Sequence, residues 1–315
     1  MKMQNRVYGV VGIKSIMSNW NADFSGRPKT TSNSDIFGSD KAFKYPIKRM
    51  WDIEGEKVLY IKSYKIDKVK VDKQTVDKLQ PRDLKERYEY IFKKELNDST
   101  PSREVLSNLF QAIDVMNFGA TFAESKQNIS ITGAVQVGQG FNKYQESNIE
   151  TQDILSPYRN PSEKKEDATA SSLGTKIVTD EAHYFYSFSV NPDNYSDYLD
   201  LEIDGFEGYT VEAYEKFKKG CLIAATAFNT NSKSGCENEF ALFIECKKGS
   251  QLYLSNLDQY VEFEKRDGRN TIILCDLEKL LRSKLEEIEK IEVYFNQLQT
   301  DVDTCGLPCT IKDLY

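Results

Sequence analysis

Several short segments of the chain alternate between hydrophobic and polar residues or are continuously hydrophobic, and both patterns predict β-strands. The clearest are residues 6–17, rich in Val and Ile with Gly9 and Gly12 among them, and the strictly alternating residues 181–191. Glycine inside a strand lets another chain or backbone come close. Weaker patterns predict further strands in 57–64, 118–123, 129–137, 239–246 and 291–296.

Other segments repeat hydrophobic residues every three to four positions, as an amphipathic helix does. Residues 100–116 carry such a stripe, which includes Leu109, and Pro101 suits the first turn of this helix. Residues 35–51 combine one hydrophobic face with a face of lysines. Similar patterns predict helices in 79–96, 210–226 and 277–288.

The 315 residues are enough for one large domain or two ordinary ones. The order of predicted elements fits an α+β fold with one sheet and helices on one side, for which a ferredoxin-like (RRM-like) core is expected. We therefore predict a single domain over residues 1–315 that carries insertions. Residues 147–179 have little periodicity, and so long a stretch is either disordered or a functional projection.

No membrane or secretion signal is recognisable in the sequence. Residues 1–12 lack the apolar stretch and cleavage site of a signal peptide, and no run of about 18 apolar residues occurs. We expect a cytoplasmic protein without membrane contact, whose six cysteines are reduced thiols. Only Cys305 and Cys309 are close in sequence and the chain has one histidine, so neither a structural zinc nor another cofactor is expected.

Charge is distributed unevenly along the chain. The formal net charge of −7 argues, for the chain as a whole, against a nucleic-acid-binding protein. Residues 1–100, however, contain 21 Lys and Arg against 14 Asp and Glu, whereas residues 101–315 contain 21 against 35. One end can therefore present a basic surface and the other an acidic one, and these would attract each other in a head-to-tail stack of copies.

The sequence offers little for catalysis. The only histidine, His183, lies inside a predicted strand, where a packed or hydrogen-bonded role is the simpler interpretation. Residues 9–15, GVVGIKS, have Ile13 where a phosphate-binding loop needs glycine before its lysine. Asp23, in the polar loop 18–34, could bind a metal but is more often an ordinary turn residue.

Two segments carry groups suited to RNA. Residues 19–49 combine lysines and arginines with aromatic and amide side chains; the cations can neutralise phosphates and the rings can stack on bases. Residues 133–142 combine amides with glycines that let a ribose-phosphate chain come close. Each segment could equally be structural, as a solvated helix face and a glycine-kinked strand end.

Taken together, four segments resemble the backbone subunit of type I Cascade complexes, the Cas-seven or DevR-type family of CRISPR-associated RAMP proteins, and most closely its subtype I-B branch. They are NWNADFSGRPKT at 19–30 with FKYPIKRMW at 43–51, NFGATFAE at 117–124, ISITGAVQVGQGFNKY at 129–144, and SSLGTK at 171–176 followed by EAHYFYSFSVNP at 181–192. Many relatives have proline where Ala134 stands here, and the C-terminal third matches less distinctly.

The resemblance implies an RRM-like palm, helical fingers at 52–116 and a β-hairpin thumb at 145–180. Copies would form a helical filament along CRISPR RNA and grip its sugar-phosphate backbone, while each thumb displaces one nucleotide and base pairing reads the target. Matched position by position, the resemblance implies RNA contacts by Asn19, Asn21, Arg27, Lys44, Lys48, Arg49, Val135, Gln136, Gln139 and, as an apolar wedge near the thumb tip, Leu173.

These inferences predict a non-catalytic CRISPR RNA scaffold without a catalytic residue or metal site. Its partners would be CRISPR RNA, target DNA paired to the guide, further copies of the chain, other Cascade subunits and a recruited helicase-nuclease. Two alternatives stay open. One is a type III-like subunit that cuts target RNA with Asp23, and the other is a protein-interaction scaffold without RNA.

Overall fold

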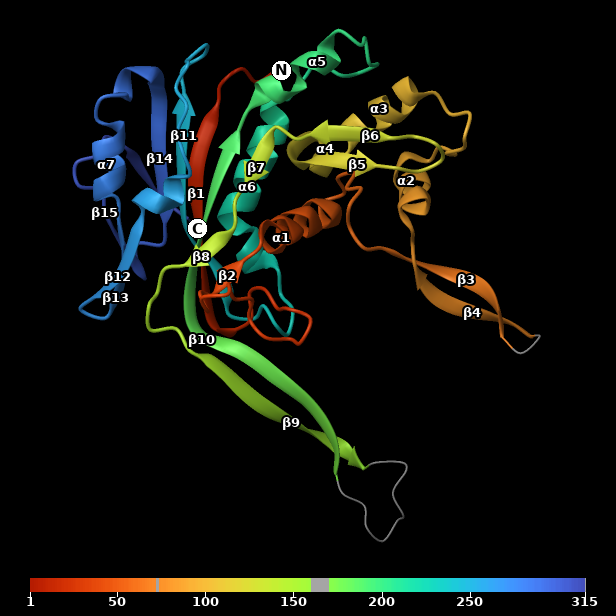
Figure 1. Cartoon of the computed structure of the whole chain (residues 1–315), viewed down its shortest axis with the longest axis horizontal. Helices are drawn as coiled ribbons and strands as arrows, with labels where there is room; N and C mark the ends of the chain where they lie inside the picture. Colours follow the sequence, from red (N-terminus) through yellow and green to blue (C-terminus); the bar gives the residue numbers. More distant parts are fainter. Residues whose placement is uncertain (72–73, 160–169, 315) are drawn as a thin grey trace.

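One large sheet organises the chain into a mixed α/β fold, in a computed structural model that describes residues 1–71, 74–159 and 170–314 (Figure 1). Its central strand pairs antiparallel on both sides and is flanked by two long strands: β1 (Val7–Ser18) lies between β10 (Ala170–Val190) and β11 (Cys236–Cys246). The strands predicted in 6–17, 181–191 and 239–246 are therefore confirmed.

Shorter strands extend this sheet in both directions. Beyond β11 lie β14 (Ile288–Phe295) and, parallel to it at the edge, β16 (Thr310–Asp313). Beyond β10, four strands continue the pairing: β7 (Val135–Val137), β8 (Gly140–Asn142), β9 (Ile149–Arg159) and, paired to β8, β2 (Phe37–Gly38). The predicted strand 129–137 is in fact two, β6 (Ile129–Thr132) and β7, in different sheets.

Both faces of the sheet are covered by a hydrophobic core. Successive residues of β1 point to opposite faces and therefore belong to different cores. Val7, Val11 and Ile13 belong to one hydrophobic core, and Tyr8 and Val10 to the other. The larger core contains the hydrophobic side of two helices, α1 (Asp40–Ile53) and α6 (Val211–Ala227). The smaller core contains α7 (Cys275–Leu281) and a second sheet of β12 (Glu262–Arg266), β13 (Arg269–Ile273) and β15 (Thr300–Asp303).

The close approach expected at the strand glycines occurs at Gly9. A Cβ atom there would collide with the carbonyl oxygen of Leu242 and the ring of Phe188, so this position of β1 excludes any larger residue. Gly12 is less tightly enclosed, with side-chain atoms of Phe240 and Phe185 3.1 and 3.3 Å from the Cβ position.

Residues 52–116 are only partly helical. They contain the hairpin β3 (Tyr64–Val71)–β4 (Gln74–Pro81), so the predicted strand 57–64 is wrong except for its last residue. The predicted helix 79–96 is shorter, because Asp83 and Glu86 form a capping box that starts α2 at Leu84. The predicted helix 100–116 is two helices separated at Ala112. These helices and the next strand are α2 (Leu84–Phe92), α3 (Ser102–Gln111), α4 (Ile113–Phe118) and β5 (Gly119–Phe122).

The hairpins β3–β4 and β9–β10 project from the body of the molecule (Figure 1). The second one occupies the segment 147–179, whose sequence has no regular pattern. Its pairing runs from Thr179 and Ile149 at the base to Ala170 and Arg159, and residues 160–169 lie outside the described residues. The remaining short helices are η1 (Pro192–Tyr195), α5 (Ser196–Leu199), η2 (Leu257–Tyr260) and η3 (Leu285–Glu287).

The predicted helix 277–288 is also too long, since α7 ends at Leu281 and β14 begins at Ile288. The small sheet β12–β13–β15 has no counterpart among the sequence predictions. Over the residues that the structure describes, no helix is both long and apolar enough to span a bilayer.

Candidate nucleic-acid interface

Three lysines lie on one side of α1. Lys41, Lys44 and Lys48 are three and four positions apart, a spacing that stacks side chains along one helix face. The hydrophobic residues of α1, among them Ile47 and Trp51, face the core. Burial of the hydrophobic stripe therefore determines the direction in which the lysines point.

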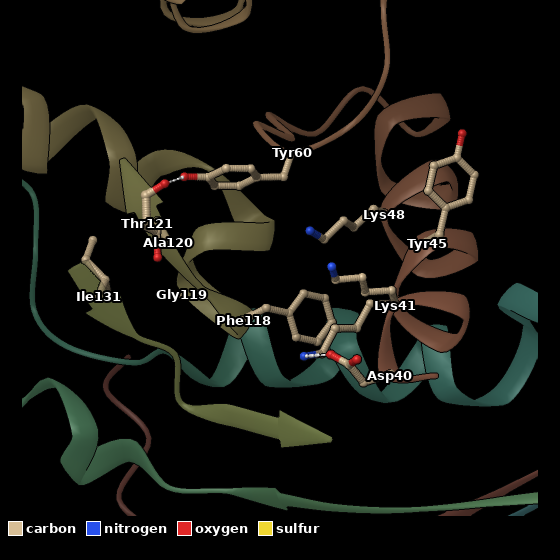
Figure 2. Close-up of a pocket in the computed structure, with 11 residues that line it drawn as sticks. Asp40, Lys41, Tyr45, Lys48, Tyr60, Phe118, Gly119, Ala120, Thr121 and Ile131 are labelled. Atoms are coloured by element: carbon tan, nitrogen blue, oxygen red, sulfur yellow. Dashed lines mark hydrogen bonds and ion pairs between the residues drawn. The ribbon is translucent and has the colours of Figure 1, made fainter. Parts of the chain in front are cut away.

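The lysines line a cavity of about 480 Å³ between α1 and the hairpin β5–β6 (Figure 2). Across from them lie Tyr60 and Phe118, together with residues of β5 and β6. The hydroxyl of Tyr60 donates a hydrogen bond to the carbonyl oxygen of Thr121 at 2.6 Å, which connects the segment before β3 to β5. The complete lining is Asp40, Lys41, Lys44, Tyr45, Lys48, Tyr60, Phe118, Gly119, Ala120, Thr121 and Ile131.

The charge in this cavity is predominantly positive. Lys44 Nζ lies 2.9 Å from Asp40 Oδ2, and Lys48 Nζ lies 3.7 Å from Oδ2 of the fully buried Asp114. Burial lowers the pKa of Lys48, although Asp114 acts in the opposite direction. Lys41 is exposed and makes no ion pair with any residue that the structure describes. Its ammonium is therefore free for an external anion.

Aromatic rings accompany the lysines. Lys44 Nζ lies 5.3 Å from the ring centroid of Phe118, and Lys48 Nζ lies 5.5 Å from that of Tyr60. Cations beside exposed or half-buried rings suit a phosphate-linked chain with attached bases. Of the three cavity lysines and the two aromatic residues across from them, sequence reasoning named Lys44 and Lys48 as contacts. Lys41 could have been found from its helical spacing, but Tyr60 and Phe118 come from distant segments.

Arg49 lies on another side of α1. Its guanidinium is 2.8 Å from Asp52 Oδ2, and it lines a separate, more apolar groove between α1 and α6. Lys48 and Arg49 are adjacent in sequence, but successive helical residues point about 100° apart. The structure thus separates Arg49 from the lysine cavity.

Asn19 and Asn21 hold the polar loop in place. Asn19 is buried, and its Nδ2 donates to the carbonyl oxygens of Gly26 and Ile177 at 3.0 and 3.1 Å. Asn21 Oδ1 accepts a 2.8 Å hydrogen bond from the backbone N–H of Ser39, the N-cap residue of α1. Both amides therefore position α1 and the loop. Asn19 Oδ1 has no hydrogen-bond partner among the described residues, but it is buried and so is not accessible to RNA.

Arg27 and Asp23 occupy the tip of the same loop. Asp23 Oδ1 accepts three hydrogen bonds, from N and Oγ of Ser25 at 2.8 Å each and from the backbone N–H of Arg27 at 2.9 Å. The hydrogen bond from the Ser25 hydroxyl is the main reason that the pKa of Asp23 is lowered. Arg27 is exposed and lines a cavity of about 340 Å³ beside Ser147 and Ile149, at the base of the hairpin β9–β10.

The segment 133–142 is partly buried. Val135 is fully buried, backbone included, whereas Gln136 and Gln139 are exposed. The Nε2 of Gln136 donates a hydrogen bond to the carbonyl oxygen of Gly133 at 2.8 Å. A Cβ atom on Gly140 would collide with the ring of Tyr186, so packing within the protein accounts for this glycine. Leu173 belongs to β10 by its backbone, and its side chain lies outside the described residues.

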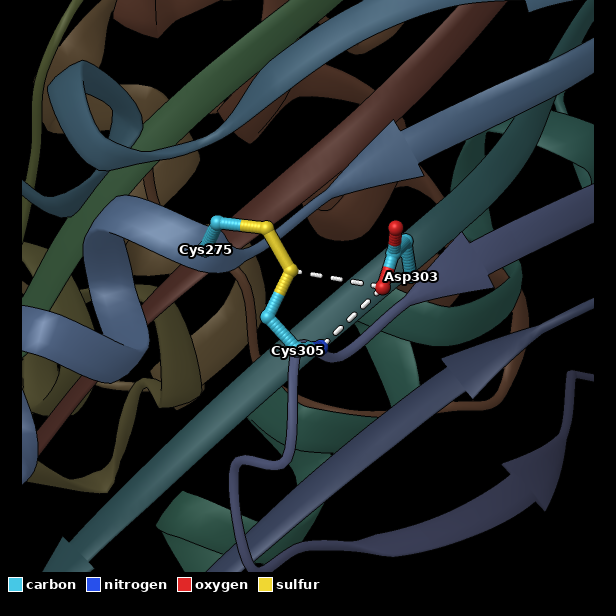
Figure 3. Close-up of side chains that lie close together, drawn as sticks. All are labelled: Cys275, Asp303 and Cys305. Carbon is cyan, nitrogen blue, oxygen red and sulfur yellow. Dashed lines mark hydrogen bonds between the residues drawn. A yellow bond between two sulfur atoms is a disulfide. The ribbon is translucent and has the colours of Figure 1, made fainter.

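The expectation that all cysteines are reduced thiols is wrong for two of them. Cys275 and Cys305 are joined by a disulfide (Figure 3). Cys309 is a free thiol. The pair meets because β15 lies beside the start of α7, where the backbone N–H of Leu274 donates to the carbonyl oxygen of Asp303 at 2.9 Å. Proximity in sequence, which singled out Cys305 and Cys309, did not predict this contact.

Comparison with known proteins gives one family and a common fold. The family model described as CRISPR-associated protein Cas7 matches residues 5–288. A solved chain of a "CRISPR RNA-guided surveillance complex, pre-nicking" is similar over 98% of this chain and 96% of its own length, with a TM-score of 0.55 and 14% sequence identity. A second chain, from a "CRISPR RNA-guided surveillance complex", covers 97% and 95% with a TM-score of 0.49 and 14% identity. No curated protein matches the chain significantly.

Proposed function

The chain belongs to the CRISPR-associated Cas7 family, and we propose that it is the non-catalytic backbone subunit of a type I Cascade surveillance complex. The observation that carries this proposal is the cavity with Lys41, Lys44 and Lys48 on one wall and Tyr60 and Phe118 on the other. Such a cavity can hold phosphates by charge and stack a sugar or base without reading its identity. This is what a protein needs if it must bind any guide and leave recognition to base pairing.

The strand order supports an RRM-like palm. Four antiparallel neighbours, β11–β1–β10–β8, together with α1 and α6, have the order and helix placement of a ferredoxin-like core. We propose that residues 52–116 act as fingers and that residues 145–180, which contain most of the hairpin β9–β10, act as a thumb. Subtype I-B remains part of this proposal, on the resemblance of the sequence segments.

RNA contacts are proposed mainly for charged and polar groups that line the two cavities or are exposed. Lys41, Lys44 and Lys48 would bind phosphates, and Arg27 would do so near the thumb base. Gln136 and Gln139 would hydrogen-bond the sugar-phosphate chain, and the buried Val135 would hold this segment in place. Asn19 and Asn21 would act indirectly by holding the loop, and Leu173 remains the proposed wedge near the thumb tip. Arg49 has no proposed contact, because it faces another groove.

The proposed partners follow from this role. CRISPR RNA would be bound directly, further copies would stack along it, and target DNA would be held mainly by pairing to the guide. Other Cascade subunits and a recruited helicase-nuclease complete the list. The three hydrogen bonds accepted by Asp23 Oδ1 favour a loop-closing role for this carboxylate over RNA cleavage.

Co-purification of RNA tests the proposal. The chain is co-expressed with its complex and a CRISPR array, and the length and amount of nuclease-protected RNA are measured. Lys41→Glu with Lys44→Glu should lower the amount of protected RNA. The control is Lys279→Glu on α7 with Arg282→Glu at its C-cap, which makes the same change in charge away from the cavity. This double variant should leave the amount of protected RNA unchanged. A wild-type complex without protected RNA, or equal loss in both double variants, would contradict the proposed function.

A further inference from the structure

Two cysteines and an aspartate meet where the chain passes from the small sheet to the edge of the large one. Cys275 is the first residue of α7, Asp303 is the last residue of β15, and Cys305 lies in the turn that leads to β16 (Figure 3). β16 is exposed along its whole length and pairs only with β14 among the described strands. A bond between α7 and this turn therefore restrains the path of the C-terminal strand.

The three side chains converge closely. The Cα atoms of Cys275 and Cys305 are 5.0 Å apart, and one ligand atom from each of the three residues lies within 4.8 Å of the others. Asp303 Oδ1 is 3.3 Å from Cys305 Sγ and accepts the backbone N–H of Cys305 at 3.1 Å. The other oxygen, Oδ2, is 3.4 Å from Arg266 Nη1, which leaves Oδ1 directed at the sulfurs. Cys305 is exposed, so the cluster is accessible from solvent.

The Asp303 carboxylate stabilises neither a disulfide nor a free thiolate at this position, but it can bind a metal ion together with two thiolates. A neutral disulfide gains little from a carboxylate oxygen at this distance, and a free thiolate would be repelled by it. A divalent cation reverses the sign of the interaction, because both sulfurs and the carboxylate can then be anionic around one positive charge. Thiolate ligands favour zinc over magnesium or calcium, which prefer oxygen.

We propose that Cys275, Cys305 and Asp303 form a zinc-class metal site when the cysteines are reduced, with the disulfide as the oxidised form of the same site. Reduction by a dithiol breaks the S–S bond and delivers two electrons and two protons, which yields two thiols and an oxidised dithiol. Binding of the cation then releases the two thiol protons and forms two sulfur–metal bonds. Three protein ligands leave one position of a tetrahedral zinc for water. This proposal does not depend on the proposed RNA-binding role.

Cys309 provides a matched control four residues further along. It lies outside the cluster and packs against the smaller core, and burial raises the pKa of its thiol. A protonated, half-buried thiol is a poor metal ligand. Replacing Cys309 therefore removes one nearby thiol without removing a proposed ligand.

Zinc content of the full chain tests the proposal. The protein is reduced with a dithiol, incubated with zinc, dialysed without oxygen and analysed for metal per chain. We expect about one zinc in wild type and Cys309→Ser, its loss in Cys275→Ser, and weaker binding in Asp303→Asn. In wild type, zinc should also protect Cys275 and Cys305 from alkylation, a readout that remains if a variant fails to fold. A disulfide that resists the dithiol in the folded protein, the absence of bound zinc, or full zinc retention in Cys275→Ser would overturn the proposal.

Discussion

His183 Nδ1 lies 2.6 Å from Glu239 Oε2, and both side chains are buried in the large sheet. The other ring nitrogen, Nε2, lies 3.1 Å from Oε1 of Glu181, and the ring stacks on Phe263 of β12 at a centroid distance of 3.9 Å. Glu239 Oε1 in turn accepts a 2.8 Å hydrogen bond from Nδ2 of Asn270 in β13. The packed, hydrogen-bonded interpretation of the single histidine is confirmed, and this network joins the large sheet to the small one.

Replacing His183 by Ala should destabilise the protein by about 3 kcal/mol, because it leaves the buried carboxylate of Glu239 without its imidazole partner. Urea unfolding of the purified chain measures this loss. Glu181→Gln is the matched control and should cost much less, since the Glu181 side chain is partly exposed at 21%. Equal losses in the two variants would show that the buried His183–Glu239 hydrogen bond contributes no more to stability than the partly exposed one to Glu181.

Stability should fall in acid through Glu292. Burial alone would raise the pKa of this carboxyl, but hydrogen bonds from Lys218 and Lys312 outweigh burial and lower it from 4.5 to about 2. A lowered folded-state pKa stabilises the folded chain above the ordinary value of 4.5, and this contribution is lost as the pH falls from about 4.5 to about 2. Thermal unfolding across that range should show a smaller dependence on pH in Glu292→Gln. Parallel curves for the two proteins would contradict the prediction.

The two neighbouring cations of α1 should differ in RNA binding. Lys44→Ala should weaken binding of CRISPR RNA and lower the slope of log affinity against log salt by about one, because one phosphate contact is lost. Arg49→Ala should leave the slope unchanged, since Arg49 pairs with Asp52 in another groove. Fluorescence anisotropy with a labelled guide over a salt series distinguishes them. A slope that falls equally in both variants would place Arg49 on the RNA.

Asp23→Ala should loosen the polar loop and should leave target RNA uncut, as wild type does. Loss of the three hydrogen bonds to Oδ1 should loosen the loop and increase the rate of its proteolysis. The assembled complex, incubated with complementary RNA and a divalent metal, should give the same uncut RNA with either protein. Regularly spaced cleavage by wild type that disappears in Asp23→Ala would establish the endoribonuclease alternative.

Two glycines of the segment 133–142 should respond differently to alanine. At Gly140 a Cβ atom meets the Tyr186 ring, so Gly140→Ala should cost about 1–3 kcal/mol of stability. At Gly138 the nearest atom is the carbonyl oxygen of Ser187 at 3.6 Å, an ordinary contact, and Gly138→Ala should leave the stability nearly unchanged. Thermal unfolding measures both. If Gly138→Ala weakens RNA binding at unchanged stability, Gly138 is the glycine that lets the ribose-phosphate chain come close.

Local periodicity was sufficient to predict a strand or helix wherever a single segment carries its own hydrophobic pattern. The strand around Gly9, the alternation around His183 and the hydrophobic stripe of α1 were recognisable because each face is defined by residues two to four positions apart. The segments that resemble the Cas-seven family could also be recognised from the sequence, because each is a short continuous run of residues. The hairpin β3–β4 was missed because its strands are mostly exposed and rich in lysine, which leaves no hydrophobic face to recognise.

Contacts between distant segments required the folded chain. Helical rotation places Lys44 toward the cavity and Arg49 away from it. Tyr60 and Phe118 join the lysines only because the segment before β3 and the junction of α4 with β5 pack across from α1. In the same way, Cys275 meets Cys305 across 30 residues and not the nearby Cys309. A one-dimensional pattern states which face of an element is buried, whereas the packing of elements decides which exposed faces meet.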